Sequence, residues 1–93
     1  MKESSAEQDA RLVREVLRGN DDAYKRLMDK YVKIAGAIAY GTTGDFHIAA
    51  DIVQEAFIKV YRKLDKLKNP ATVRKYLTDT VRTTALDWLR RHR

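Results

Sequence analysis

Apolar residues recur three and four positions apart in four separate stretches of this 93-residue chain. That spacing is typical of α-helices that bury one face, because a helix completes a turn every 3.6 residues. No stretch of four or more residues alternates between apolar and polar positions, so β-strands are not expected. The stripes are formed by Leu12, Val13, Val16 and Leu17; by Ala23, Tyr24, Leu27, Met28, Tyr31, Ile34, Ala35 and Ile38; by Ile48, Ile52, Val53, Ala56, Phe57, Val60, Tyr61 and Leu64; and by Val73, Tyr76, Leu77, Val81, Ala85, Trp88 and Leu89.

Residues that favour helix ends separate these stripes. The expected N-caps are Ser4 or Ser5, with Glu7 or Gln8 completing a capping box, then Asn20 or Asp21, and then Asp45. Gly19 and the Gly-Thr-Thr-Gly run at residues 41–44 are expected to end the first two helices. Asn69 and Pro70 mark the last break, since the residue before proline avoids the α region and proline suits a first helical turn. We therefore predict an all-α fold, a compact bundle of four helices of about 13–22 residues each.

Length and composition fit one ordinary globular domain over residues 1–93, with 44% hydrophobic and 34% charged residues. The absence of cysteine excludes disulfides, iron–sulfur sites and thiol chemistry, and is compatible with a reducing cytosol. The longest apolar run, residues 34–40, is too short to span a bilayer, and the first residues do not resemble a signal peptide. The sequence stops within a basic pattern at residues 90–93, so we expect a piece of a longer protein.

The charge is distributed unevenly along the chain. The formal net charge is +6, yet residues 1–46 contain equal numbers of basic and acidic side chains. Residues 47–93 contain eleven basic and five acidic ones and so carry the whole surplus. This concentration favours a surface that faces a polyanion, although solubility alone also accounts for a charge of this size.

Motifs for catalysis and metal binding are missing from the sequence. It contains no His-Glu-x-x-His, no glycine-rich phosphate loop and no Glu-x-x-His pair of the kind that holds two metals in a helical bundle. His47 and Asp51 are four residues apart and can meet on one helix face, but two such residues do not make a metal site. We therefore expect no enzymatic activity, no metal and no cofactor.

The basic surplus gathers around the last helix and the segment before it. The last helix carries Arg74, Lys75, Arg82, Arg90, Arg91 and Arg93 against Asp79 and Asp87, and Lys59, Arg62, Lys63, Lys66 and Lys68 precede it. Positions 75, 78, 79, 82, 86 and 90 lie opposite its apolar stripe. Cations on such a face hold a phosphate backbone while short polar groups reach bases, but an ordinary solvated face has the same composition.

The third helix carries a surface of a different kind. Asp51, Gln54 and Glu55 are spaced i, i+3 and i+4, so they share one face while the apolar residues between them turn toward the core. An acidic and amide patch suits docking onto basic residues of a partner protein. The alternative is local, because Glu55 and Lys59 have the spacing of a surface ion pair within one helix.

These segments together resemble region 2 of bacterial extracytoplasmic-function (ECF) sigma factors. The resemblance covers nearly the whole chain and rests on residues 51–61 (DIVQEAFIKVY), Tyr76, Leu77 and residues 85–91 (ALDWLRR), preceded by residues 17–20 (LRGN) with Ala23, Tyr24, Leu27 and Tyr31. The chain departs from the family at Tyr76, where tryptophan is usual, and at Thr83, where asparagine is common. Its loop at residues 66–70 (KLKNP) also lacks the aromatic residue often found there.

The resemblance implies a subunit of transcription initiation in the bacterial cytoplasm, with core RNA polymerase, promoter DNA and an anti-sigma protein as partners. Asp51, Gln54, Glu55, Ile58 and Lys59 would bind the clamp helices of the largest polymerase subunit. The next loop and the last helix would bind the non-template strand of the −10 element, capture an unstacked base and help to open the duplex. The implied DNA-binding residues are Lys66, Lys68, Asn69, Arg74, Lys75, Arg82, Thr83, Asp87, Arg90 and Arg91. The family's C-terminal domain, which reads the −35 element, is absent from this chain.

Three other functions fit parts of the sequence. A helical module could bind duplex DNA or RNA through its basic last helix without any polymerase. A phosphotransfer bundle could use His47 as its acceptor. A simple scaffold would make no special use of Asp51, Gln54 and Glu55.

Overall fold

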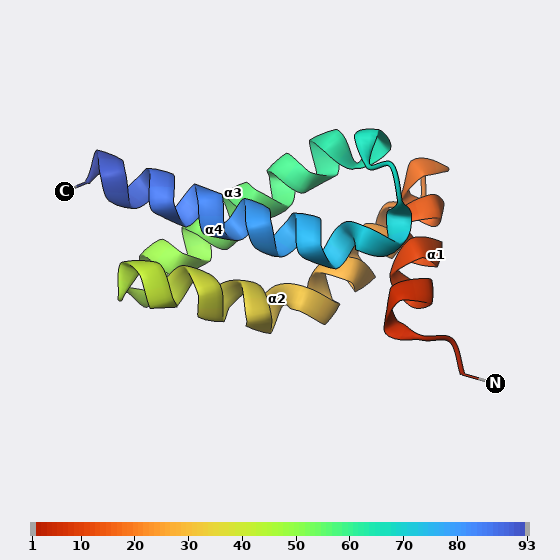
Figure 1. Ribbon diagram of the computed structural model, residues 1–93, viewed down its shortest axis with the longest axis horizontal. Helices are drawn as coiled ribbons and strands as arrows, with labels where there is room; N and C mark the ends of the chain where they lie inside the picture. Colours follow the sequence, from red (N-terminus) through yellow and green to blue (C-terminus); the bar gives the residue numbers. More distant parts are fainter. Residues whose placement is uncertain (1, 93) are drawn as a thin grey trace.

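A computed structural model describes residues 2–92, and its regular elements are helical (Figure 1). The four α-helices are α1 (Ser5–Leu17), α2 (Asp21–Thr43), α3 (Phe46–Lys63) and α4 (Val73–Arg91). Two short 3-10 turns, η1 (Leu64–Lys66) and η2 (Pro70–Thr72), lie between α3 and α4. No strand occurs within residues 2–92, so the predicted all-α bundle of four helices is confirmed.

Polar side chains cap the first three helices, as the sequence predicts. The Oγ of Ser4 accepts a hydrogen bond from the N–H of Glu7 at 3.1 Å, and the Glu7 carboxylate accepts one from the N–H of Ser4 at 3.1 Å. This reciprocal pair is the expected capping box of α1. The side chains of Asn20 and Asp45 accept bonds from backbone N–H groups in the first turns of α2 and α3. Ser4 and Asn20 are thus the caps among the predicted alternatives.

Glycines in the left-handed region end α1 and α2. Gly19 has φ +99° and Gly44 has φ +69°, a conformation that costs glycine little because it has no Cβ. The predicted break at residues 41–44 was therefore placed too early, since Gly41 is still helical and the helix ends only at Gly44. In that last turn the hydroxyl of Thr43 donates to the carbonyl of Ala39 at 2.9 Å, which keeps the turn closed.

The four predicted stripes form one core, with three exceptions: Leu17, Tyr61 and Leu89, which is only partly buried and does not pack against the main cluster. Val13, Val60, Val73 and Val81 from α1, α3 and α4 are buried almost completely, as is Ala35 of α2. Leu17 was predicted to be buried but is 50% exposed, and α1 ends at this residue. Tyr61 was also predicted for the core but is 46% exposed, and its hydroxyl donates to Asp21 at 3.1 Å. The edge of its ring instead covers the buried Tyr24, with ring centroids 4.9 Å apart.

Helices α2, α3 and α4 pack against one another, and α1 crosses one end of this group (Figure 1). At that end α1 contacts α2, the start of α4 and both 3-10 turns. Pro70 opens η2 rather than the helix itself, so α4 begins three residues later, at Val73. The loop at residues 64–72 therefore rests directly on α1.

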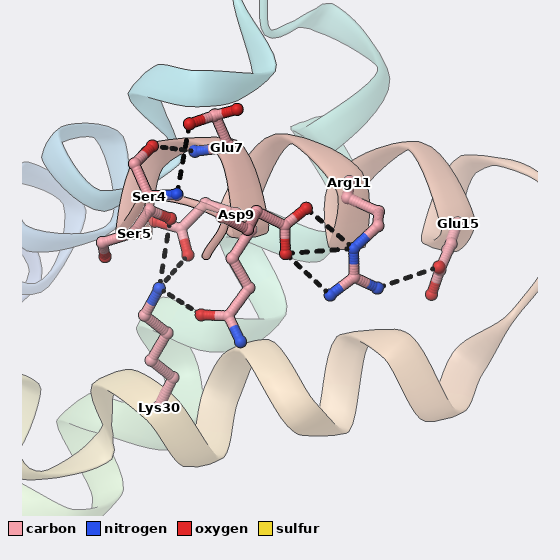
Figure 2. A network of polar contacts seen from close by, with 9 residues as sticks. Ser4, Ser5, Glu7, Asp9, Arg11, Glu15 and Lys30 are labelled. Carbon is pink, nitrogen blue, oxygen red and sulfur yellow. Dashed lines mark hydrogen bonds and ion pairs between the residues drawn. The ribbon is translucent and has the colours of Figure 1, made fainter. Parts of the chain in front are cut away.

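A buried carboxylate fastens α1 to α2. Asp9 is 1% exposed, and its side chain accepts a hydrogen bond from Lys30 Nζ at 2.7 Å (Figure 2). It also accepts one from the Tyr31 hydroxyl. Lys30 Nζ also donates to the Gln8 side chain at 2.8 Å and to the backbone carbonyl of Ser5 at 3.2 Å. The ammonium of Lys30 is thereby surrounded by oxygen atoms of the first turns of α1, which fixes where α1 sits along α2.

Candidate functional site

The residues expected to bind a protein lie on the exposed face of α3. Asp51, Gln54 and Glu55 are all exposed, and we call this set the acidic face. The apolar residues between them point into the core, as predicted: Ile52 and Val53 are 4% and 7% exposed. The cap at Asp45 sets the start of α3 and thereby which residues turn outward. Helix geometry thus presents two carboxylates and an amide to solvent on a rigid support.

Ile58 and Lys59 extend this surface by one turn. Ile58 is 51% exposed, and Lys59 Nζ lies 3.4 Å from the Glu55 carboxylate, so the predicted ion pair within α3 is present. Both side chains of the pair are about half exposed, which limits its contribution to a few tenths of a kcal/mol. Lys59 Nζ also donates to the hydroxyl of Thr84 at 3.2 Å, so it links α3 to α4.

Basic side chains of α4 are paired with carboxylates of the same helix. Asp79 accepts from Lys75 Nζ at 2.6 Å and from Arg82 at 3.3 Å, and the bond from Lys75 lowers the pKa of this carboxyl below its usual value. Arg90 is paired in the same way with Asp87. The predicted DNA-binding face of α4 therefore carries alternating charges held in fixed positions rather than an uninterrupted row of cations.

The threonines of α4 use their hydroxyl hydrogens within the helix. Thr83 Oγ1 donates to the carbonyl of Asp79 at 2.8 Å, and Thr80 and Thr84 make similar bonds of 2.7 Å to the carbonyls of Tyr76 and Thr80. Thr83 is exposed on the outer face, whereas Thr84 is 1% exposed. Thr83 thus turns a methyl group and oxygen lone pairs toward anything that binds there.

A basic trough runs from the loop before α4 along the junction of α3 and α4. One hollow of about 440 Å³ is lined by Lys63, Lys66, Leu67, Lys68, Asn69, Thr72 and Tyr76. A second, of about 550 Å³, is lined by Lys59, Arg62, Lys63, Tyr76, Asp79, Thr80, Thr83 and Thr84. Lys63 and Tyr76 line both hollows, so the two are continuous, and we call them together the basic trough.

The trough includes residues that the resemblance did not assign to a site. Arg62 and Lys63 stood out in the sequence only as part of a basic run, and Tyr76 only as part of the apolar stripe and of the resemblance, without a role in binding. Arg62 and Lys63 line the hollow from α3 and Tyr76 lines it from α4, an arrangement that depends on how the two helices pack. The predicted residue Asn69 faces the trough, but its side-chain oxygen accepts from the N–H of Ala71 at 3.0 Å and so shapes the turn.

The predicted DNA-binding residues do not form one compact cluster. Lys66, Lys68 and Asn69 lie in the loop, and Arg74 and Lys75 begin α4. Arg90 and Arg91 lie at its other end, about 22 Å from Lys75 at the rise of an α-helix. There, Glu55, Lys59, Asp87, Arg90 and Arg91 line a single hollow, so the last turn of α4 adjoins the acidic face.

The structure gives no support to a metal site at His47. This residue lies exposed in the first turn of α3, and residues 2–92 contain no group of three histidine, aspartate or glutamate side chains placed to hold a metal ion. Arg93, which the sequence included among the basic residues of the last helix, lies outside the described residues. Over the described part of the chain, no helix has the length and apolar character needed to cross a membrane.

Comparison with known proteins agrees with this geometry. The family described as Sigma-70 region 2 matches residues 24–93. A probable RNA polymerase sigma factor, RfaY, of Xanthomonas campestris pv. campestris is 37% identical over 75 residues, which cover 81% of this chain and 19% of that protein. The ECF RNA polymerase sigma-E factor of Escherichia coli K12 is 35% identical over 80 residues, covering 84% of this chain and 40% of that protein.

A third relative, the ECF RNA polymerase sigma factor SigW of Bacillus subtilis, is 36% identical over 53 residues, covering 57% of this chain and 28% of that protein. The chain thus spans between about a fifth and two fifths of the length of these curated relatives. No solved structure matches it.

Proposed function

We propose that this chain, which belongs to the sigma-70 region 2 family and within it to the ECF sigma factors, binds core RNA polymerase and recognises the −10 element of promoters. Such a domain guides polymerase to the promoter and helps to open the DNA duplex, and it catalyses no reaction itself. It would act in the bacterial cytoplasm, and an anti-sigma protein that covers it is a further proposed partner.

The proposed contact with polymerase uses the acidic face with Ile58 and Lys59. The two carboxylates are exposed and lie one helical turn apart, which suits pairing with arginine or lysine side chains of a partner helix. Ile58 adds an exposed apolar side chain beside them. Charge complementarity would set the orientation of the complex, and the apolar contact would add to its lifetime.

The proposed contact with DNA uses the basic trough and the outer face of α4. Lysine and arginine side chains of the trough would hold the phosphates of a single strand, and Tyr76 offers a ring on which a base can stack. Opening of the duplex would follow because an unstacked base held there no longer pairs with the other strand. The residues proposed for this role are Lys66, Lys68, Asn69, Arg74, Lys75, Arg82, Thr83, Asp87, Arg90 and Arg91.

The observation that carries the proposal is the shared edge of the two surfaces. Lys59 contacts Glu55 of the acidic face and also lines the trough beside Thr84. Because α3 and α4 pack along one another, a polymerase bound to one surface and a DNA strand bound to the other would be held at a fixed relative position. Promoter opening requires that polymerase and the DNA strand keep such a fixed relative position.

The polymerase contact is tested by reversing the charge of the acidic face. We expect Asp51→Lys with Glu55→Lys to abolish retention of purified core polymerase by the immobilised domain, while the far-ultraviolet circular dichroism stays helical. The matched control is Glu3→Lys with Glu15→Lys, which changes the net charge equally at positions on α1 and just before it. Undiminished binding by the first variant would contradict the proposal.

The DNA contact is tested separately with a short fluorescent single strand of mixed sequence and with duplex DNA. Arg82→Ala with Arg90→Ala should weaken binding of the single strand and reduce its salt dependence, by a slope of roughly 1.4 if both side chains contact phosphates. Arg14→Ala with Arg18→Ala on α1 serves as the control. Tight binding of duplex DNA without polymerase would instead favour an independent nucleic-acid-binding module.

A further inference from the structure

A second surface groove lies between α2 and α3, and apart from its edge at Asp51 and Gln54 it takes no part in the contacts proposed above. It has a volume of about 700 Å³, and its walls include Val32, Gly36, Tyr40, Phe46 and Phe57. Helices α2 and α3 meet at the turn that joins them (Figure 1) and pack against one another. The residues that line the groove come from both helices. Most of its lining is apolar, which is unusual for the surface of a chain that is one third charged.

Large hydrophobic side chains stand exposed in this groove. Phe46, the first residue of α3, is 74% exposed, Val32 is 46% exposed and Tyr40 is 40% exposed. The rings of Tyr40 and Phe46 stack with their centroids 4.3 Å apart and their planes 15° apart. Stacking holds the phenylalanine in one position although solvent surrounds it. An ordered aromatic pair beside an apolar groove is typical of a binding surface, because exposed apolar area is otherwise disfavoured.

The groove continues into the acidic face without a break. Asp51 and Gln54 line its edge on α3, and Lys33 lines it on α2. The rim therefore carries a negative charge on one side and a positive charge on the other, above an apolar floor. A helix fits this arrangement if it has an apolar ridge, a basic residue that meets Asp51 and an acidic residue that meets Lys33.

We propose that the polymerase-binding surface extends from the acidic face into this groove, where an apolar ridge of a polymerase helix packs against Phe46. This inference rests on the proposed function, because it takes the partner of the acidic face to be core polymerase. Phe46 acts as the apolar anchor of the complex, and Asp51 with Gln54 fixes the register of the bound helix. The wall that Phe46 shares with Asp51 and Gln54 is the reason to assign both regions to one partner.

Two substitutions test the groove without disturbing the fold. Phe46→Ala removes the anchor, and since this side chain is largely exposed its loss leaves the core intact. Gly36→Leu fills the groove from below, because a Cβ at Gly36 meets no atom within 4 Å and leucine is favoured over glycine inside a helix. Gly41→Leu is the matched control, since Gly41 also lies within α2, has open space around it and does not line the groove.

Binding of each variant to purified core polymerase is measured by biolayer interferometry beside the wild type and Asp51→Lys with Glu55→Lys. We expect Phe46→Ala and Gly36→Leu to weaken binding roughly thirtyfold, as loss of an interface anchor does, and Gly41→Leu to bind like the wild type. Wild-type affinity of both Phe46→Ala and Gly36→Leu, with loss of binding on charge reversal, would overturn the inference and leave the proposed function standing. Failure of the wild type itself to bind would refute the proposed function.

Sedimentation of the domain alone distinguishes a different occupant. A monomer at all concentrations is expected. A dimer that Phe46→Ala dissociates would show that a second copy of the chain fills the groove and would overturn the inference.

Discussion

Replacement of Asp9 by alanine provides a strong test of how α1 is held. The carboxylate is 1% exposed and accepts hydrogen bonds from Lys30 Nζ at 2.7 Å and from the Tyr31 hydroxyl. In Asp9→Ala the buried Tyr31 hydroxyl loses its acceptor and the Lys30 ammonium loses its counter-charge. We therefore expect α1 to detach from α2 more readily and the free energy of unfolding to fall.

The size of the effect follows from the burial of each partner. Removing one member of a buried ion pair costs about 3–5 kcal/mol. The Lys30 side chain is 23% exposed and keeps its bonds to Gln8 and Ser5, so the loss should lie at the lower end, about 3 kcal/mol. A domain of this size is typically stable by about 5–15 kcal/mol, so the change is large enough to measure easily.

Urea unfolding followed by circular dichroism measures this loss directly. Lys30→Met keeps the aliphatic stem but leaves Asp9 as a buried charge, and we expect a loss of similar size. In the double variant Asp9→Ala with Lys30→Met the losses should be well short of additive, because the two residues share one interaction. Glu15→Ala removes an exposed ion pair with Arg11 on the same helix and should cost less than about 0.5 kcal/mol. A loss under about 1 kcal/mol for Asp9→Ala would refute the reasoning.

Three further predictions concern other parts of the molecule. Burial raises the pKa of Tyr24 and Tyr31, so the unfolded chain releases these protons at lower pH than the folded chain. The two tyrosines should therefore contribute their full stabilisation below about pH 10, and the free energy of unfolding should fall as the pH rises further. Urea midpoints measured across this range should fall less for Tyr24→Phe than for the wild type. Asp79→Asn frees Lys75 and Arg82 from an exposed carboxylate, so fluorescence anisotropy should show tighter binding of single-stranded DNA with a steeper salt dependence, whereas unchanged affinity would place these cations outside the DNA contact. Gly44→Ala should lower the melting temperature, because φ +69° costs alanine about 1 kcal/mol, while Gly41→Ala within α2 should raise it by a similar amount; equal effects at both positions would contradict this account.

The helices could be predicted because the signals that define them are local. Ser4 with Glu7, Asn20 and Asp45 act on backbone groups within one turn, so their spacing in the sequence is enough to identify them. The separation of Asp51, Gln54 and Glu55 from the buried side of α3 follows from helix periodicity in the same way. Leu17 lay outside such reasoning, because it has the spacing of a core residue but is half exposed at the end of α1.

The parts that depend on packing between helices could not be predicted. Asp9 appears in the sequence as an ordinary charged residue, and its burial is evident only once Lys30 and Tyr31 are placed over it. The basic trough likewise depends on how α3 and α4 pack, since Lys63 and Tyr76 line it from different helices. Phe46 gave one usable signal: it is a large apolar residue just before the stripe of its own helix, where burial in the core is not expected.

The hydrogen bond that Thr83 makes inside α4 limits which base edges it can recognise. Its only hydroxyl hydrogen is donated to the carbonyl of Asp79, so the outer side of the oxygen accepts but does not donate. Cytosine N4, adenine N6 and, on an unpaired base, guanine N2 carry amino groups that can donate to such an oxygen, and the methyl of thymine can pack on the methyl of threonine. Acceptor atoms such as guanine O6 need a donor that this hydroxyl does not offer. The asparagine common at this position in the family has both a donor and an acceptor and suits any of these edges. If this face of α4 contacts the promoter as proposed, threonine at this position would recognise base N–H donors and the thymine methyl group but would not bind acceptor atoms such as guanine O6.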